Sequence, residues 1–566
     1  MRPYHQMSSP TVIRLRRLRR LSQALFLCAF LLFLLRTSYS GRTLDLAAVE
    51  ITTPAPVNSF FNFDPLISLA FLISAHTWYA GFVLSLLTLA ATMVLGRFFC
   101  GWVCPFGTLH HIFGNLGTRG NPLLRMLMKG EHYRRLQALK YYLLIFLLLT
   151  AAFSYLQPAA LDPLCLLARS CILSVFPSIN FLTNRLLALG MDSGAPFLSA
   201  PAEWIYRYFS AREWIGRELF YRSALITGII FVILLLANLV ITRFWCRFLC
   251  PLGALFASVS RFSLVRVRKD DARCTSCARC LIFCQGGRPR GEVLLKSPSE
   301  AEGSQSKGSL SESGIKCKTP ECLLCLNCAA ECPDDALGFE FLGVRDSSEC
   351  APDLTRRGLI MSIGASLFAI PLLRATRGMV NRSRLIRPPG ARPEGDFLST
   401  CLRCGACTRI CPTGAIHSSI AEAGLEGFWT PRLIPRTGYC VYSCTLCGQV
   451  CPSQAIRKLG AEQKMGSERL RPVKLGTAAV DRNRCIPWAR SMSCIACEEV
   501  CPVSPKAIKL DEAAVKGPTG ERFILRRPVV DARACIGCGH CEYVCPVEGA
   551  AAIRVFSAGE SRAEEI

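Results

Sequence analysis

Cysteines in groups of four are the residues of this chain most able to do chemistry. The 566-residue sequence holds 33 cysteines, and most recur as C-x2-C-x2-C-x3-C or as variants that open with C-x3-C or C-x8-C. In bacterial ferredoxins, three thiolates of such a run bind one 4Fe-4S cluster and the fourth ligates another. The spacing therefore predicts six 4Fe-4S clusters. The predicted ligands are Cys274, Cys277, Cys280 and Cys284; Cys322, Cys325, Cys328 and Cys332; Cys401, Cys404, Cys407 and Cys411; Cys440, Cys444, Cys447 and Cys451; Cys485, Cys494, Cys497 and Cys501; and Cys535, Cys538, Cys541 and Cys545.

The residue after the fourth cysteine supports the same interpretation. Proline stands there in five groups, at Pro333, Pro412, Pro452, Pro502 and Pro546. Proline holds the preceding residue extended, which turns the chain off a cluster. Only Cys284 departs, because Gln285 follows it. Repeats such as CPTGAI and CPSQAI indicate a polyferredoxin array. Two pairings remain open: neighbouring groups exchange fourth cysteines, or the first and last C-terminal groups pair while the middle two do so.

Other metal centres fit the spacing less well. Zinc sites pair two C-x-x-C knuckles and do not need a third element ending in C-x3-C-P. Haem c is excluded at the level of sequence, because no C-x-x-C-H occurs.

Four further cysteines form a different motif, C-x3-C-P, which occurs twice. Cys100 and Cys104 lie in FCGWVCPFG, and Cys246 and Cys250 lie in WCRFLCPLG. Each motif directly follows an apolar run. The four thiols either bind a shared seventh cluster or serve as free thiols or packing residues. Of the remaining cysteines, Cys165 and Cys171 form a disulfide or act as small buried apolar residues.

Apolar runs are the elements that must position these cysteines. The chain is 51% hydrophobic and 19% charged, with mean hydropathy +0.32, which excludes a disordered chain. Four runs approach the length of a membrane helix: 21–35, 80–95, 139–156 and 224–241. Together with a fifth run, they predict an α-helical membrane domain of four to five spans joined to α+β ferredoxin modules.

The charge distribution predicts the orientation. Basic residues crowd the N-terminus and the loop 97–140, which places both in the cytoplasm by the positive-inside rule. The net charge of +25 needs no nucleic-acid partner, since flanking basic residues belong to the membrane topology and each four-thiolate cluster carries about −2. We therefore expect a protein of the bacterial inner membrane, with membrane lipid and no nucleic acid among its partners.

The fifth run, 359–373, follows Arg356-Arg357. Twin arginines before a modest apolar stretch are typical of signals that export folded proteins, whereas the alternative is a buried core helix. The predicted domains are a membrane domain at 1–260, a cytoplasmic two-cluster module at 261–350 with a flexible linker at 286–316, a signal or anchor helix at 355–375, a linker at 376–397, and a periplasmic four-cluster domain at 398–566.

These motifs resemble known families. The helices, the paired FCGWVCPFG and WCRFLCPLG motifs and two cysteine groups resemble NapH-type membrane iron-sulfur proteins over residues 1 to about 350, with relatives among nitrous-oxide-reductase accessory proteins. From about 355 onward, the twin-arginine segment and four groups resemble the NapG or MauM type of periplasmic ferredoxin. The chain looks like a fusion of the two. The resemblance implies quinol oxidation in the membrane and electron transfer to a periplasmic reductase or cytochrome.

A quinol releases protons as well as electrons, so the membrane part needs a proton acceptor. His76, beside the second apolar run, is the candidate. Asp64 precedes Pro65 and is better explained as a helix N-cap. Three alternatives remain: electron flow in reverse to reduce quinone, a redox accessory or metallocofactor-maturation role like that of cytochrome-oxidase assembly factors with C-x3-C-P motifs, and a soluble regulator that binds nucleic acid.

Overall fold

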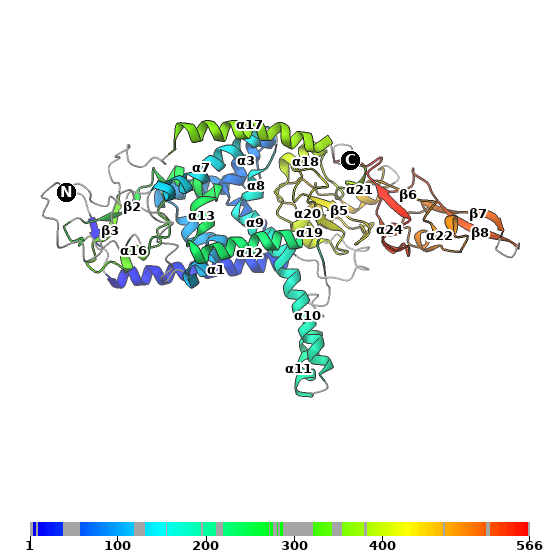
Figure 1. Cartoon of the computed structure of the whole chain (residues 1–566), viewed down its shortest axis with the longest axis horizontal. Helices are drawn as coiled ribbons and strands as arrows, with labels where there is room; N and C mark the ends of the chain where they lie inside the picture. The colour runs from blue at the N-terminus through cyan, green and yellow to red at the C-terminus, as the bar shows by residue number, and fades with distance from the viewer. Residues whose placement is uncertain are drawn as a thin grey trace.

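The computed structural model describes residues 4–6, 9–37, 57–117, 131–153, 155–193, 196–210, 219–270, 272–275, 280, 283–286, 321–341, 354–378, 382–467, 470–516 and 521–563. The molecule is elongated, and its middle is built of helices that run along the long axis (Figure 1). One cysteine-rich part lies at the end that carries β2, β3 and α16. The other, from α18 to the C-terminus, lies at the opposite end (Figure 1).

The helical part contains the predicted apolar runs. Its helices are α1 (Ser9–Arg36), α2 (Asn58–Asn62), α3 (Pro65–Ala75), α4 (Phe82–Leu95), α5 (Pro105–Gly117), α7 (Glu131–Ala152), α8 (Pro158–Leu161), α9 (Pro163–Ser170), α10 (Phe176–Asp192), α11 (Pro196–Ser210), α12 (Ala224–Val240), α13 (Phe244–Phe248), α14 (Pro251–Ser260) and α17 (Arg356–Gly378). The four runs lie mainly in α1, α4, α7 and α12. π-helical turns η2 (Phe99–Val103) and η3 (Cys171–Val175) interrupt the series.

Three segments among the described residues are long and apolar enough to cross a membrane: Pro10–Arg36, Pro163–Asp192 and Arg356–Thr376. The helices α4 and α12 have 14 and 17 residues and fall short of that length. The count of four to five spans therefore stays a prediction. The fifth apolar run, 359–373, lies within a longer helix. That helix, α17, has 23 residues and includes the arginines on both sides of the run.

The segment Pro163–Asp192 is not one uninterrupted α-helix, because a π-helical turn lies within it. All eight residues of α9 are buried in the helical part, and η3 follows directly. Beyond it, α10 pairs with α11, and this hairpin projects away from the molecule across the direction of α1 and α17 (Figure 1). The hairpin carries exposed apolar side chains, including Phe197 (76% exposed) and Trp204 (65%).

The first cysteine-rich part is organised on a three-stranded antiparallel sheet with the order β1-β3-β2. Its strands are β1 (Tyr4–Gln6), β2 (Val265–Lys269) and β3 (Leu337–Phe341), and the short α16 (Asn327–Ala330) precedes β3. The extreme N-terminus thus completes a sheet whose other strands come from residues after the helices. The predicted linker 286–316 lies outside the described residues, apart from Gly286.

The C-terminal part consists of short helices and two-stranded antiparallel sheets. Its helices are the 3-10 turn η5 (Arg382–Arg384), α18 (Glu394–Thr400), α19 (Ala406–Ile410), α20 (Leu446–Gln449), α21 (Ala461–Met465), α22 (Ile486–Ala489), α23 (Ala496–Glu499) and α24 (His540–Val544). Its strands pair as β4 (Ile416–Ser418) with β5 (Pro431–Leu433), β6 (Thr477–Val480) with β9 (Ile553–Phe556), and β7 (Ile508–Lys516) with β8 (Arg522–Val530).

The interpretation of 376–397 as a linker is wrong for its described residues. Residues 376–378 complete α17, and those from 382 onward pack into the C-terminal part. Arg387 is 2% exposed, forms an ion pair with Glu394, and donates from Nη1 to the Pro431 carbonyl at 2.7 Å. Its guanidinium also lies 4.6 Å from the centre of the Phe397 ring. The Arg/Pro/Gly-rich composition predicted a linker. In the structure, the Arg387 guanidinium is buried and forms hydrogen bonds and an ion pair within the C-terminal part.

The C-terminal part packs directly on the helical part. Ser74 of α3 donates to the Ser399 carbonyl at 2.8 Å, and the Trp429 indole donates to the Thr227 hydroxyl at 3.1 Å. The guanidinium of Arg169 lies 3.6 Å from the centre of the Trp429 ring. These contacts hold the Cys401–Cys411 loop against the helical part.

Candidate iron-sulfur sites

The loop that begins at Cys401 wraps around a cavity of about 410 Å³. Three of its cysteines, Cys401, Cys404 and Cys407, line this cavity together with Cys451 of the next group. Gly405, with φ of 83°, caps α19 and turns the loop between the second and third cysteines. The left-handed conformation is open to glycine at no steric cost.

Two further cavities repeat the pattern at the far end of the C-terminal part. A cavity of about 370 Å³ is lined by Cys485, Cys494, Cys497 and Cys545. A cavity of about 350 Å³ is lined by Cys501, Cys535, Cys538 and Cys541. Each cavity therefore takes three cysteines from one group and the fourth from its neighbour. This geometry favours the exchange of fourth cysteines between neighbouring groups over the first-with-last pairing.

The remaining C-terminal group follows the same rule. Cys444 and Cys447 interact electrostatically with Cys440 of their own group and with Cys411 of the preceding one. The groups 401–411 and 440–451 thus exchange fourth cysteines with each other, as the groups 485–501 and 535–545 do.

The chemistry of these cavities fits a 4Fe-4S cluster. Burial raises the pKa of Cys404 and of Cys497 to about 12, because a thiolate there loses its hydration. Bound iron would reverse this, since a metal-ligating thiol loses its proton outright. Backbone amides also reach the sulfurs: Ala478 N lies 3.4 Å from Cys535 Sγ, and Ala552 N lies 3.4 Å from Cys545 Sγ.

No three His, Cys, Asp or Glu side chains among the described residues gather tightly enough to hold a single metal ion. A cuboidal cluster spaces its four ligands further apart than one ion does, so this result and the four-cysteine cavities are compatible.

The two N-terminal groups gather around α16. Cys280 of the first group packs on the same small core as Cys322, Cys328 and Cys332 of the second. Cys277 lies outside the described residues. Gln285, which stands where the other groups have proline, donates from its side-chain Nε2 to His111 Nδ1 at 2.7 Å, and its backbone carbonyl accepts from Arg247 Nε at 3.1 Å. Gln285 therefore links the first cysteine group to the helical part through two hydrogen bonds.

A buried ion cluster ties the second group to the helices in the same way. Glu321, directly before Cys322, accepts from Arg97 and Lys140, and the Tyr141 hydroxyl donates to its other carboxylate oxygen at 2.5 Å. Both cysteine groups are therefore anchored by the residue next to a cysteine, which spacing alone did not indicate.

The two C-x3-C-P motifs come together inside the helical part. Cys100, Cys104, Cys246 and Cys250 are each 3–8% exposed, and their thiols interact electrostatically with one another. The second cysteine of each motif caps the next helix: Gly107 N lies 3.4 Å from Cys104 Sγ, and Gly253 N lies 3.2 Å from Cys250 Sγ. The matching contacts give the two motifs a common local geometry.

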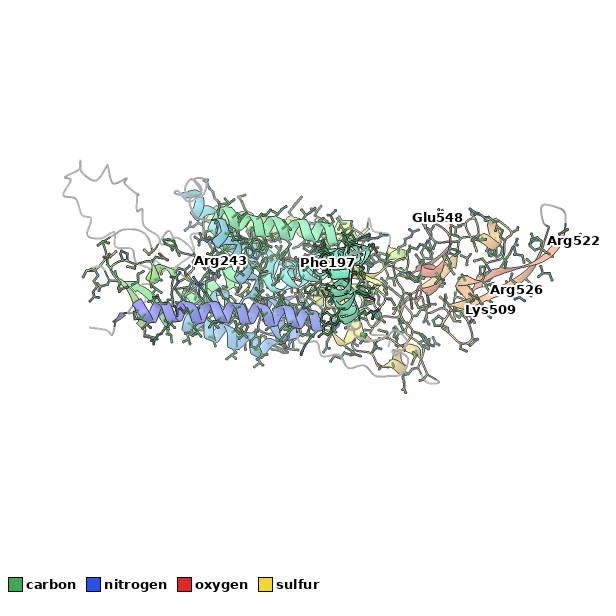
Figure 2. All side chains as sticks on the ribbon, turned by 90° about the horizontal axis from the view of Figure 1, so that it is seen from below. Phe197, Arg243, Lys509, Arg522, Arg526 and Glu548 are labelled. Carbon is green, nitrogen blue, oxygen red and sulfur yellow. The ribbon has the colours of Figure 1, made fainter. Side chains whose placement is uncertain are left out.

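Arg243, labelled in the helical part in Figure 2, is buried and interacts electrostatically with the Cys246 thiol. Its Nη1 donates to the Cys100 carbonyl at 2.8 Å, whereas Nε and Nη2 have no hydrogen-bond acceptor among the described residues. A buried guanidinium with two unused donors needs an anion, and a cluster held by four thiolates is one.

His76 and the leftover cysteines stand apart from these centres. His76 is exposed at the C-terminal cap of α3, with φ of 53°. His110 is buried, with Nδ1 2.6 Å from the Asn238 side-chain oxygen. Cys165 and Cys171 are both buried free thiols, so the disulfide considered for them is not formed.

Asp64 is the predicted N-cap, and it has a partner that the sequence did not reveal. One oxygen of Asp64 accepts from Leu66 N at 2.8 Å, and one oxygen of Asp162 accepts from Leu164 N at 2.9 Å. The two carboxyl groups lie close enough to interact with each other, and the Cys165 thiol is a further neighbour of Asp162. Both residues are 0% exposed. The sequence offers one signal for this pair, because an Asp-Pro dipeptide stands at the start of both helices, at Asp64-Pro65 and at Asp162-Pro163.

Comparison with protein-family models finds iron-sulfur domains in both halves of the chain. A model described as a 4Fe-4S binding domain matches residues 77–122 and 223–270, which contain the C-x3-C-P motifs. A second 4Fe-4S binding domain matches 397–417, and a 4Fe-4S dicluster domain matches 484–549. No solved structure matches the chain.

Individual relatives match part of the chain. The methylamine utilization ferredoxin-type protein MauM of Methylorubrum extorquens is 36% identical over 178 residues, which are 31% of this chain and 73% of that protein. MauM of Paracoccus denitrificans is 36% identical over 33% of this chain and 78% of that protein. The ferredoxin-type protein NapG of Escherichia coli is 33% identical over 29% of this chain and 67% of that protein. The chain therefore belongs to the family of MauM and NapG ferredoxin-type, iron-sulfur electron-transfer proteins.

Proposed function

We propose that this protein is a quinol dehydrogenase of the bacterial inner membrane, in which a NapH-type membrane part is fused to a NapG- or MauM-type ferredoxin. It would oxidise quinol from the membrane pool and deliver electrons to a periplasmic reductase or cytochrome. The observation that carries the proposal is the placement of cysteine-rich parts at the two opposite ends of one helical body (Figure 1).

The 24 cysteines of the six groups are the proposed cluster ligands, with fourth cysteines exchanged between neighbours. The four buried cysteines of the C-x3-C-P motifs are the proposed ligands of a seventh cluster. The family-model match over both motifs and the two unused donors of Arg243 support this seventh site. When bound, these clusters would supply one-electron chemistry.

The proposed topology puts the N-terminus and the first two cysteine groups in the cytoplasm and the four C-terminal groups in the periplasm. The basic residues of the N-terminus and of loop 97–140 support this orientation. So does α17, which runs along the helical body between the two cysteine-rich parts (Figure 1). Its twin arginines fit an export signal that stays as an anchor.

Quinol oxidation also needs groups that accept protons. His76 is exposed at the end of α3, whose Ser74 contacts the C-terminal part, and we propose it as the first acceptor. The buried Asp64–Asp162 pair is the second proposed protonatable site, since two adjacent buried carboxylates disfavour both being charged.

The decisive experiment is anaerobic purification in detergent followed by iron and sulfide analysis and titration with a quinol analogue. Six clusters correspond to about 24 irons and seven to about 28. We expect quinol to bleach the cluster absorbance, and we expect Cys246→Ala to lose about four irons while Cys28→Ala, outside every motif, loses none.

Intact clusters that no quinol bleaches would reject the dehydrogenase and leave the accessory or maturation role. Recovery of the absorbance when quinone is added to pre-reduced clusters, without bleaching by quinol, would point to reverse flow. A reporter fused to the C-terminus tests the topology separately, and a cytoplasmic signal would remove the outward electron path.

A further inference from the structure

The cysteine group with the irregular C-x3-C opening has a charged neighbour. Lys464 of α21 is 4% exposed. Its Nζ lies 3.2 Å from Cys440 Sγ and 2.7 Å from the Val441 carbonyl, and it also donates to the Cys444 carbonyl. A lysine ammonium has three donors and no acceptor, so these three contacts use it completely.

The extra residue in the C-x3-C loop explains how the ammonium fits. Val441, Tyr442 and Ser443 separate the first two cysteines, one residue more than in the regular groups. The longer loop presents two carbonyls to the same point. In addition, the Tyr442 hydroxyl donates to the Met465 carbonyl at 2.9 Å. This second contact joins the loop to α21 at the residue next to Lys464.

The helix that carries Lys464 is itself held in place. Gly460 N donates to the Gln463 side-chain oxygen at 2.9 Å, which caps the start of α21. Val473 N donates to the Lys464 carbonyl at 3.1 Å. The ammonium is therefore a built element of the cysteine site and not a mobile surface charge.

Other sulfurs of the C-terminal cavities have neutral hydrogen-bond donors. Cys535, Cys545 and Cys451 accept from backbone amides at 3.4–3.5 Å. Within the described residues from 382 onward, no cysteine sulfur other than that of Cys440 receives a hydrogen bond from a charged side chain. Positive charge beside a cluster favours its reduced form, which carries one more negative charge.

We propose that Lys464 is a positioning residue that raises the reduction potential of a cluster held by Cys440, Cys444, Cys447 and Cys411. This inference rests on the proposed cluster assignment but not on quinol as the donor. The step concerned is the gain of one electron by the cluster, supplied by a chemical reductant in a titration, with no proton transferred.

The test is a redox titration of the full chain in detergent, followed by electron paramagnetic resonance. The variants are Lys464→Met, which removes charge and hydrogen bonds, and Lys464→Gln, which keeps a donor. Lys458→Met, an exposed lysine of the same part, is the matched control. We expect one signal to become at least tenfold harder to reduce in Lys464→Met, which is about 59 mV for a one-electron couple. We expect a smaller shift in Lys464→Gln and none in Lys458→Met.

Unchanged potentials with iron content intact would overturn the proposal, as would equal shifts of all signals. Loss of one cluster in both Lys464 variants would also overturn it, because the lysine would then serve retention and not potential. Since the titration uses a chemical reductant, failure of quinol to bleach the clusters would reject the dehydrogenase without touching this result.

Discussion

The carboxyl groups of Asp64 and Asp162 meet in the interior of the helical part, each at the start of a helix that continues with proline. Each spends one oxygen on the amides of its own helix. Because two adjacent buried carboxylates would repel each other, we expect the pair to hold a proton. A pair of helix caps thereby becomes a buried acid.

This pair predicts an unusual pH dependence of stability. Burial, followed by the charge of Asp162, raises the pKa of Asp64 well above its ordinary value, so the native state holds its proton more tightly than the unfolded chain. The stabilising contribution is complete below the unfolded pKa of about 3.9 and is lost as the pH rises towards the native pKa. Asp64→Asn keeps the cap, and its amide can donate to Asp162.

We expect Asp64→Asn to be more stable than the parent at pH 7 by about 1.4 kcal/mol for each unit of the native pKa shift, with the difference shrinking towards pH 4. Denaturant unfolding in detergent at several pH values measures this. Asp192→Asn, at an exposed helix end, is the control and is expected to show no such trend. A constant difference at all pH values would contradict the shared proton.

The exchanged fourth cysteines predict non-additive iron loss. Cys404 and Cys451 line the same cavity, although they belong to different groups. We expect Cys404→Ala, Cys451→Ala and the double variant each to lose about four irons. The control Cys171→Ala removes a buried thiol outside the groups and is expected to retain all iron. A loss of about eight irons in the double variant would mean that each group binds its own cluster.

The buried cluster around Glu321 predicts a large stability effect. Glu321→Gln leaves the charges of Arg97 and Lys140 without their carboxylate, and breaking a buried pair in this way costs about 3–5 kcal/mol. Glu331→Gln is the matched control, because its contact with Arg16 at 3.7 Å is partly exposed, and such pairs contribute about 0–1 kcal/mol. Denaturant unfolding distinguishes the two, and equal effects would be inconsistent with a buried anchor.

The contact between the two parts of the chain predicts a local effect of Trp429. Its ring stacks with Arg169 and its indole donates to Thr227. We expect Trp429→Leu to weaken docking by about 2 kcal/mol, the size of a desolvated cation–π contact. Hydrogen exchange should rise at Leu156, whose amide donates to the Leu398 carbonyl across the junction at 3.3 Å. Trp204→Leu, in the exposed hairpin, should leave exchange there unchanged.

Much of the candidate site could be predicted from local spacing. Three cysteines of one group line one cavity in all three cavities described, and where the spacing is C-x2-C-x2-C the loop is too short to place them elsewhere. Apolar runs likewise become helices, since their composition favours burial along a whole length. The iron-sulfur chemistry could therefore be predicted from the sequence without a structure. The similarity to the ferredoxin-type proteins MauM and NapG supports that prediction.

Relations between distant segments were decided by the tertiary structure alone. The partner of Cys451 depends on how two loops dock, and spacing carries no information about docking. The same holds for Asp162 beside Asp64, for Gln285 beside His111 and for Lys464 beside Cys440. In each pair, neither residue by itself indicates from its local sequence which residue will be its partner. Buried charges and polar atoms must find partners wherever the packed chain supplies them, and only three-dimensional proximity shows which partner that is.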